Sequence, residues 1–217
     1  MNTAKVKAYA KLNLSLDIKG VSDGFHMLDS FVCTVDLYDL IVAKKRKDGQ
    51  VFVTFKGLDA DKIPPFGNNV EKAANAFFKR FDGTGAEITV FRNIPVGAGM
   101  GASSADISGT LAALSLLYPR PFDEVKDLAD SLGSDTGYLM SGGFKRISGR
   151  GEIVEPVPES SVERLHFLAI CPQSGVSAGE CYRAYDELRA VYPACTQEAV
   201  DLVTQIPCNS NNRLILR

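Results

Sequence analysis

Residues 86–117 read AEITVFRNIPVGAGMGASSADISGTLAALSLL and join a strand, a glycine-rich loop and a helix. AEITVF is typical of a β-strand, and the apolar residues after position 106 recur at helical spacing. Between them, Gly97, Gly99 and Gly101 let backbone N–H groups approach a ligand closely. The helix that follows adds its unpaired donors and the positive end of its dipole. This order of elements predicts a polyphosphate site.

The loop matches neither of the two common phosphate-binding motifs. It lacks the Gly-Lys-Ser/Thr ending of a Walker A motif, and its helix does not lie inside a βαβ unit with the downstream acidic residue of a Rossmann fingerprint. Ser103 and Ser104 can add hydroxyl donors or touch a metal ion. A simpler interpretation stays open, in which the segment is a flexible glycine turn and Ser103 caps the helix.

Outward from the loop, the sequence pattern predicts further strands and helices. Strict alternation in AKLNLSLDI (10–18) predicts a half-buried strand whose leucines face the core. Further strands are predicted at 31–43, 50–55, 86–91 and 165–171, and helices at 69–81, 107–117, 122–132, 177–190 and 195–205. The basic run 44–47 is predicted to be the solvated tip of a hairpin rather than a binding patch. Early strands followed by helices favour an α+β fold.

Composition narrows the class of protein. The 217 residues are 45% hydrophobic and 23% charged, which is ordinary for a globular chain of one large or two small domains. The net charge is -2, so the chain has no excess of basic residues. Proteins that bind nucleic acid or an anionic membrane by charge usually have such an excess, so neither is expected as a partner. Without a signal peptide or a membrane-length apolar stretch, a cytoplasmic location is expected. The five cysteines are scattered and predict neither a disulfide framework nor a zinc site.

Two separate residues suit phosphoryl transfer. The carboxylate of Asp135 could accept a hydroxyl proton, and the ammonium group of Lys11 could stabilise the developing alkoxide. Each also has a simpler interpretation: Asp135 as the N-cap of a short helix, and Lys11 as a solvated lysine on a strand. Spacing alone does not show that the two side chains meet.

Four segments, in order along the chain, resemble the signatures of the GHMP small-molecule kinases. They are AKLNLSLDIKGVSDGFH, NIPVGAGMGASSAD, LGSDTGYLMSGGFKRISGRGE and PQSGVSAGECYRAYDEL. Within that superfamily they are most similar to the 4-diphosphocytidyl-2-C-methyl-D-erythritol kinases of non-mevalonate isoprenoid biosynthesis, and the likeness covers nearly all of residues 4–190. The resemblance implies ATP-dependent phosphorylation of the substrate's 2-hydroxyl group.

The resemblance also implies the architecture and the site. The α+β fold would comprise an ATP-binding domain of the ribosomal protein S5 domain 2-like class over 1–150 and an incomplete α+β domain over 151–217. Lys11 and Asp135 would be the catalytic pair, with ATP and Mg²⁺ as cofactors, the metal arriving with ATP and having no dedicated protein ligands. The implied nucleotide-binding residues are Asn69, Arg92, Gly97, Ala98, Gly99, Met100, Gly101, Ala102, Ser103 and Ser104.

The implied substrate-binding residues are Asn13, Phe25, His26 and Tyr182. Phe25 stands where the family has tyrosine, which keeps an aromatic face for cytosine but loses the hydroxyl group. Tyr182 would stack on the other face of the base, and His26 would hydrogen-bond its edge. The alternative is that Phe25 belongs to the core and His26 is an ordinary surface histidine.

Two departures from the family pattern keep other functions open. The loop is one residue shorter than is usual for the diphosphocytidyl enzymes, which favours a homoserine or mevalonate type of kinase. The family's second glycine-rich segment is not found, which favours a catalytically inactive nucleotide-binding relative. Because strands of the 151–217 domain would then lack their cover, a homodimer is also a hypothesis.

Overall fold

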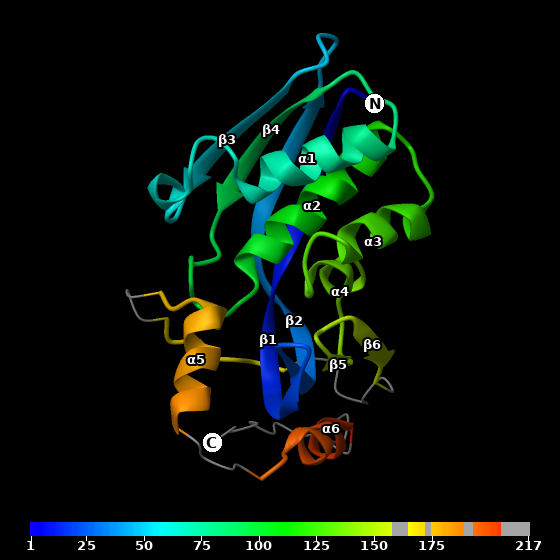
Figure 1. Cartoon of the computed structure of the whole chain (residues 1–217). Coiled ribbons are helices and arrows are strands. Elements are labelled where there is room, and N and C mark those ends of the chain that lie inside the picture. The colour runs from blue at the N-terminus through cyan, green and yellow to red at the C-terminus, as the bar shows by residue number, and fades with distance from the viewer. Residues whose placement is uncertain (158–164, 172–174, 189–192, 205–217) are drawn as a thin grey trace. The chain divides into compact units, whose positions relative to one another are not determined.

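The computed structural model describes residues 1–157, 165–171, 175–188 and 193–204. Strands and helices are both present, which confirms the predicted α+β class (Figure 1). The strands are β1 (Thr3–Ser22), β2 (Phe25–Lys45), β3 (Val51–Gly57), β4 (Ala86–Arg92), β5 (Lys145–Gly149) and β6 (Ile153–Pro156). The helices are the short 3₁₀ turn η1 (Ala60–Lys62), α1 (Asn69–Arg80), α2 (Ala102–Leu117), α3 (Phe122–Asp130), α4 (Thr136–Ser141), α5 (Ala178–Leu188) and α6 (Thr196–Thr204).

The chain forms two compact units, and both are discontinuous in sequence. Unit 1 comprises Met1–Lys11 and Thr34–Gly142, and unit 2 comprises Leu12–Cys33 together with the described residues from Gly143 onward. The long strands β1 and β2 therefore contribute residues to both units. The domain ranges 1–150 and 151–217 follow the resemblance to a family rather than compactness, and they stay a prediction.

The sheet of unit 1 has β4 between β2 and β3. β4 is antiparallel to β2, with Leu40 opposite Phe91, and parallel to β3, with Val51 opposite Ala86. The prediction of a hairpin tip at 44–47 was therefore wrong, because the two flanking strands do not pair with each other. A parallel β3–β4 pair needs a crossover, and α1 supplies it.

Helices cover the sheet of unit 1 and bury its core. α1 begins after Asn68, whose side chain caps the helix by accepting a hydrogen bond from the amide of Glu71 (2.9 Å). α1 and α2 lie side by side over the strands (Figure 1). Phe77, Leu111 and Ile88 are fully buried, and each such side chain stabilises the fold by roughly 1.5–3 kcal/mol.

Unit 2 departs from the sequence pattern in two places. Residues 165–171 form no strand, and Leu168 and Ile170 are 90% and 84% exposed, so the predicted strand there was wrong. In β1 the predicted alternation fails after Leu14, because Ser15 and Asp17 are buried while Leu16 is 44% exposed. The polar side chains are buried because α6 covers them, as described below.

The structure also bears on membrane insertion. None of the helices in the described ranges combines the length and the apolar character that crossing a bilayer requires.

Gly109 of α2 lies close to two strands of unit 1, β1 and β2. A Cβ atom there would lie 2.7 Å from Cβ of Ala8 and 2.8 Å from Cγ1 of Ile41. Gly109→Ala is expected to lower the free energy of unfolding by about 1–3 kcal/mol, because overpacking outweighs the gain in helix propensity. The matched control is Asn75→Ala on the exposed side of α1, which should change stability by less than about 0.5 kcal/mol. Urea unfolding of both variants measures the difference, and equal stabilities would contradict the packing argument.

Candidate active site

The glycine-rich loop lies between β4 and α2 in unit 1. Gly97, Gly99 and Gly101 have φ angles of 72°, 72° and 73°, a left-handed conformation that side chains rarely adopt. α2 begins at Ala102 after Gly101, without a capping side chain. The alternative in which Ser103 caps this helix was therefore wrong. An uncapped helix N-terminus next to a left-handed glycine loop presents amide donors to an anion.

Lys11 is packed directly against this loop. Its backbone amide donates to the carbonyl oxygen of Met100 (3.0 Å). A Cβ atom on Gly101 would lie 3.1 Å from Cγ of Lys11, so a side chain at position 101 would press on the lysine stem. By contrast, a Cβ atom on Gly99 would have no neighbour within 4 Å, which leaves open space beside the loop. Gly101 thus allows the lysine side chain to pack against the loop, and Gly99 leaves room for a ligand.

The structure brings Lys11 and Asp135 together. Nζ of Lys11 lies 3.5 Å from Oδ2 of Asp135, and the side chains are 12% and 32% exposed. Asp135 precedes α4, but its carboxylate makes no capping hydrogen bond to that helix. The residue after Asp135 is Thr136, and its carbonyl oxygen accepts a hydrogen bond from the hydroxyl group of Ser108 in α2 (2.8 Å). This bond fixes the start of α4 beside α2. The pair is therefore an ion pair held at the side of the glycine loop.

Two further predicted nucleotide-binding residues also lie together. The side-chain amide of Asn69, at the start of α1, donates to the hydroxyl group of Ser103 in the first turn of α2. Both residues are exposed. This contact brings the N-termini of two helices to the same end of the loop.

Of the predicted substrate-binding residues in unit 2, His26 and Tyr182 are in contact. Their rings are stacked, with centroids 4.6 Å apart and planes inclined by 13°. Nε2 of His26 also lies 2.8 Å from a carboxylate oxygen of Asp186. Phe25 makes a different contact: the residue is 54% exposed, and the guanidinium group of Arg150 lies over its ring, 4.4 Å from the ring centroid. Phe25 is thus not part of the core, and the predicted pairing of Phe25 and Tyr182 about a base stays a prediction.

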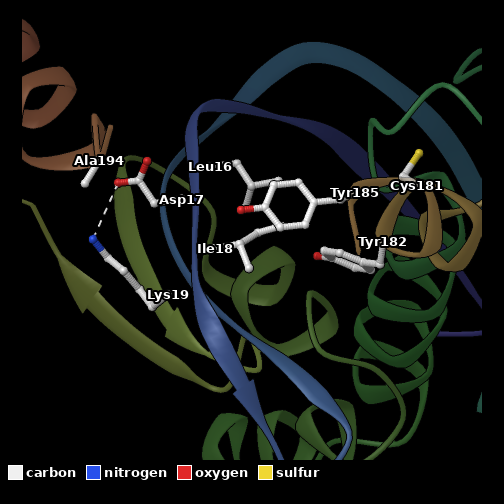
Figure 2. Close-up of a pocket in the computed structure, with 8 residues that line it drawn as sticks. All are labelled: Leu16, Asp17, Ile18, Lys19, Cys181, Tyr182, Tyr185 and Ala194. Atoms are coloured by element: carbon white, nitrogen blue, oxygen red, sulfur yellow. Dashed lines mark ion pairs between the residues drawn. The ribbon is translucent and has the colours of Figure 1, made fainter. Parts of the chain in front are cut away.

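A cavity of about 550 Å³ in unit 2 is lined in part by Tyr182. Figure 2 shows the ring of Tyr185 beside Leu16 and Ile18 of β1, with Tyr182 next to it. At the other side, Lys19 pairs with Asp17, 3.8 Å apart. Asn13, also on β1, is exposed and is not among the residues that line this cavity. The cavity therefore has an aromatic and aliphatic wall and a charged rim.

Among the residues that the structure describes, no three histidine, cysteine, aspartate or glutamate side chains gather where they could hold a metal ion.

Comparisons with known proteins agree with this geometry. A family model described as the GHMP kinases N terminal domain matches residues 68–144, which include the loop and Asp135. A 4-diphosphocytidyl-2-C-methyl-D-erythritol kinase of Clostridium botulinum (strain Eklund 17B / Type B) is 32% identical, over 90% of this chain and 69% of the relative. The chain belongs to the GHMP kinase family.

Two other comparisons show how far the likeness extends. The kinase of the same name from Cutibacterium acnes (strain DSM 16379 / KPA171202) is 34% identical over 86% of this chain and 63% of the relative. A solved structure of a 4-(cytidine 5'-diphospho)-2C-methyl-D-erythritol kinase superposes with a TM-score of 0.58 at 30% identity, over 70% of this chain and 54% of the other. The chain thus spans 63% and 69% of the length of these two curated relatives.

One residue predicted to touch the nucleotide is buried in the structure. The side chain of Arg92 is 1% exposed, with Nη1 2.6 Å from Oδ2 of Asp106 and 3.5 Å from Oδ2 of Asp39. A guanidinium group enclosed by two carboxyl groups has no free face for a phosphate. The structure therefore argues against the predicted contact and places Arg92 inside the fold.

A carboxylate that the sequence pattern does not single out holds the start of α6. Both carboxylate oxygens of Asp17 accept hydrogen bonds from the amides of Cys195 and Thr196 (2.9–3.0 Å) at the start of that helix. Burial raises the pKa of Asp17, but the hydrogen bonds from Cys195 and Thr196 outweigh it and lower the pKa to about 2. Ser15 adds a hydrogen bond to the hydroxyl of Thr196 (2.9 Å). No local signal in residues 10–18 could have predicted a partner nearly 180 residues away.

Asp17→Asn tests this attachment of α6. Because the folded-state pKa lies below the ordinary value of 3.8, the ionised carboxylate stabilises the fold above about pH 4, and that stability is lost as the pH falls towards 2. The variant is expected to lose about 2 kcal/mol of unfolding free energy near pH 7, and the difference from the parent should shrink near pH 2. Denaturant unfolding at both pH values measures it. Asp201→Asn, on the exposed side of α6, is the control; a pH-independent difference would contradict the assignment.

Proposed function

We propose that the protein transfers the γ-phosphoryl group of ATP to the 2-hydroxyl group of 4-diphosphocytidyl-2-C-methyl-D-erythritol. The observation that carries this proposal is the Lys11–Asp135 ion pair, 3.5 Å apart, beside a left-handed glycine loop. The names of the 32–34% identical relatives supply the substrate. The product would serve isoprenoid precursor biosynthesis, with the enzyme in the cytoplasm. A homodimer is also part of the proposal, and sedimentation analysis tests it.

The residues of unit 1 fit the polyphosphate of ATP. The loop is built of positive-φ glycines, space is open beside Gly99, and α2 starts without a capping side chain. Amides from Gly97 to Ser104 would hold the phosphates, with the hydroxyl groups of Ser103 and Ser104 and the amide of Asn69 at the same end. Mg²⁺ bound with ATP would neutralise charge on the transferring group.

The chemistry assigned to the ion pair is proton transfer and charge stabilisation. As the oxygen of the acceptor hydroxyl forms its bond to the γ-phosphorus atom, the bond from that phosphorus to the bridging oxygen of ADP breaks. The hydroxyl proton passes to the carboxylate of Asp135, and the ammonium group of Lys11 stabilises the negative charge that develops. The glycine loop contributes by positioning, which is most of what phosphoryl transfer requires of a protein.

The residues of unit 2 would recognise the cytidyl group. If Nε2–H of neutral His26 donates to Asp186, Nδ1 is the acceptor and suits the exocyclic amino group of cytosine. Phe25, with its exposed ring, and Tyr182 offer aromatic faces for stacking.

A second GHMP kinase activity, on homoserine or mevalonate, is favoured by the length of the loop, and a nucleotide-binding protein without activity is the third candidate. A coupled ADP-release assay with the three acceptors side by side distinguishes them. ADP release with the cytidyl substrate alone supports the proposal. Release with homoserine or mevalonate alone supports the second candidate, and ATP binding without ADP release from any acceptor supports the third.

Asp135→Asn is expected to lower kcat by at least about 100-fold, because the amide cannot accept the hydroxyl proton. The affinity for ATP should stay within about threefold of the parent, since the loop is untouched. Asp127→Asn, on the exposed side of α3, is the matched control and should turn over normally. A kcat within a few-fold of the parent for Asp135→Asn would show that Asp135 is not the base.

Phe25→Ala tests the stacking. Loss of one base–aromatic stack is worth about 1–3 kcal/mol, so KM for the cytidyl substrate should rise roughly 5- to 150-fold while KM for ATP changes little. Phe52→Ala is a close control, because Phe52 is 52% exposed and lies under Arg46 at 4.3 Å, much as Phe25 lies under Arg150. An equal rise of both KM values would remove the stacking role.

A further inference from the structure

The guanidinium group of Arg92 touches the chain on both sides of the glycine loop. Nη2 donates to the carbonyl oxygen of Ile94 (3.0 Å), just before the loop. Nη1 lies 2.6 Å from Oδ2 of Asp106 in α2, just after it. Nε donates to the carbonyl oxygen of Leu58 (3.3 Å), which fixes the guanidinium plane. One side chain therefore joins the two ends of the segment 95–101.

Asp39 of β2 also contacts the chain just before the loop. Its Oδ1 accepts the amides of Asn93 (2.6 Å) and Ile94 (2.8 Å), and its Oδ2 lies 3.5 Å from Nη1 of Arg92. Ile94 is thus held at its N–H by Asp39 and at its carbonyl by Arg92. Farther along, Asp59 accepts the amide of Val96 (3.1 Å). These three amides are used by carboxylates, so phosphate donors must come from Gly97 onward.

The charges of this cluster are almost completely removed from water. The side chains of Arg92, Asp39 and Asp106 are 1%, 0% and 6% exposed. Burial, with the carboxyl group of Asp39 nearby, raises the pKa of Asp106 against the opposing effect of Arg92. Oδ2 of Asp39 and Oδ1 of Asp106 receive no hydrogen bond from the described residues, and a proton on Asp106 would leave one carboxylate opposite the guanidinium group. The cluster would then be neutral, as a buried site requires.

We propose that Arg92 is a positioning residue for ATP, because its guanidinium group fastens the two ends of the glycine loop and keeps the amides after Val96 arranged for the phosphates. The proposal rests on the proposed kinase function. Arg92 itself touches no phosphate. Its contribution is to reduce the motion that the loop would lose on binding the nucleotide, which strengthens binding by preorganisation.

Arg92→Lys keeps one positive charge but cannot reach both ends of the loop. We expect KM for ATP to rise at least about tenfold, while KM for the acceptor stays within about twofold. Arg146→Lys in unit 2 is the matched control, because Arg146 also binds an aspartate, Asp29, through two hydrogen bonds of 2.8 Å. Both KM values of this control should stay within about twofold. If KM for ATP and KM for the acceptor rise together in Arg92→Lys, the proposal is overturned, because a general loss of stability would affect both substrates alike.

Amide hydrogen exchange followed by NMR gives a readout that does not need activity. In the parent without nucleotide, the amides of Asn93, Ile94 and Val96 should exchange at least about tenfold more slowly than those of Gly97 and Gly99; equal rates would overturn the proposal. In Arg92→Lys the difference between the two sets of exchange rates should largely disappear. A difference that persists in this variant would also overturn the proposal. If Arg92→Lys does not fold, Asp39→Asn is compared with Asp29→Asn in the same way. If the parent releases no ADP with any acceptor, the kinase proposal fails while the exchange rates still decide this one.

Discussion

The hydrogen bond from the amide of Lys11 to the carbonyl of Met100 sets the distance between a strand and a glycine loop, and the candidate site of unit 1 depends on that distance. Glycine suits position 101, because φ there is 73° and a Cβ atom would lie 3.1 Å from Cγ of Lys11. With the backbones this close, the lysine stem lies along the loop and its ammonium group reaches Asp135 at the start of α4. The loop is thus the surface on which the reactive pair is assembled as well as a candidate phosphate site.

The same chemical solution appears in both units. In unit 1, Asp39 accepts two consecutive backbone amides before the glycine loop, and in unit 2, Asp17 accepts two consecutive amides at the start of α6. A carboxylate on a strand can satisfy a turn of backbone that has no hydrogen-bond partner of its own, and charge-assisted bonds of this kind are stronger than neutral ones. Each aspartate therefore fastens an irregular segment to a regular one, which is why both are buried despite their charge.

Much of the fold follows from local pattern, and the exceptions share one cause. Helical spacing predicts α1, α2 and α3, and the glycine spacing predicts the left-handed loop, because these depend on neighbours in sequence. The predictions of the buried face of residues 10–18, of a hairpin tip at 44–47 and of a strand at 165–171 were wrong. Each depended on which strand or helix packs beside the segment, and residues that are near in sequence do not reveal that neighbour. In the site, residue types indicated Lys11 and Asp135, but only the fold shows that they are in contact. Arg92 has the right charge for a nucleotide, and its burial could not be seen from its neighbours in sequence.

The place of β4 between β2 and β3 has a consequence for the order in which the chain matures on the ribosome. When β3 leaves the exit tunnel, the strand that will separate it from β2 has not yet emerged, so the edges of β2 and β3 stay unpaired until β4 appears. The hydrogen bonds to Asp17 can form only later, after the start of α6 has been synthesised. Contacts of such long sequence separation slow folding, and they leave strand edges open to wrong partners in the meantime. We expect the nascent chain to be a substrate for holding chaperones until at least residue 92 has emerged.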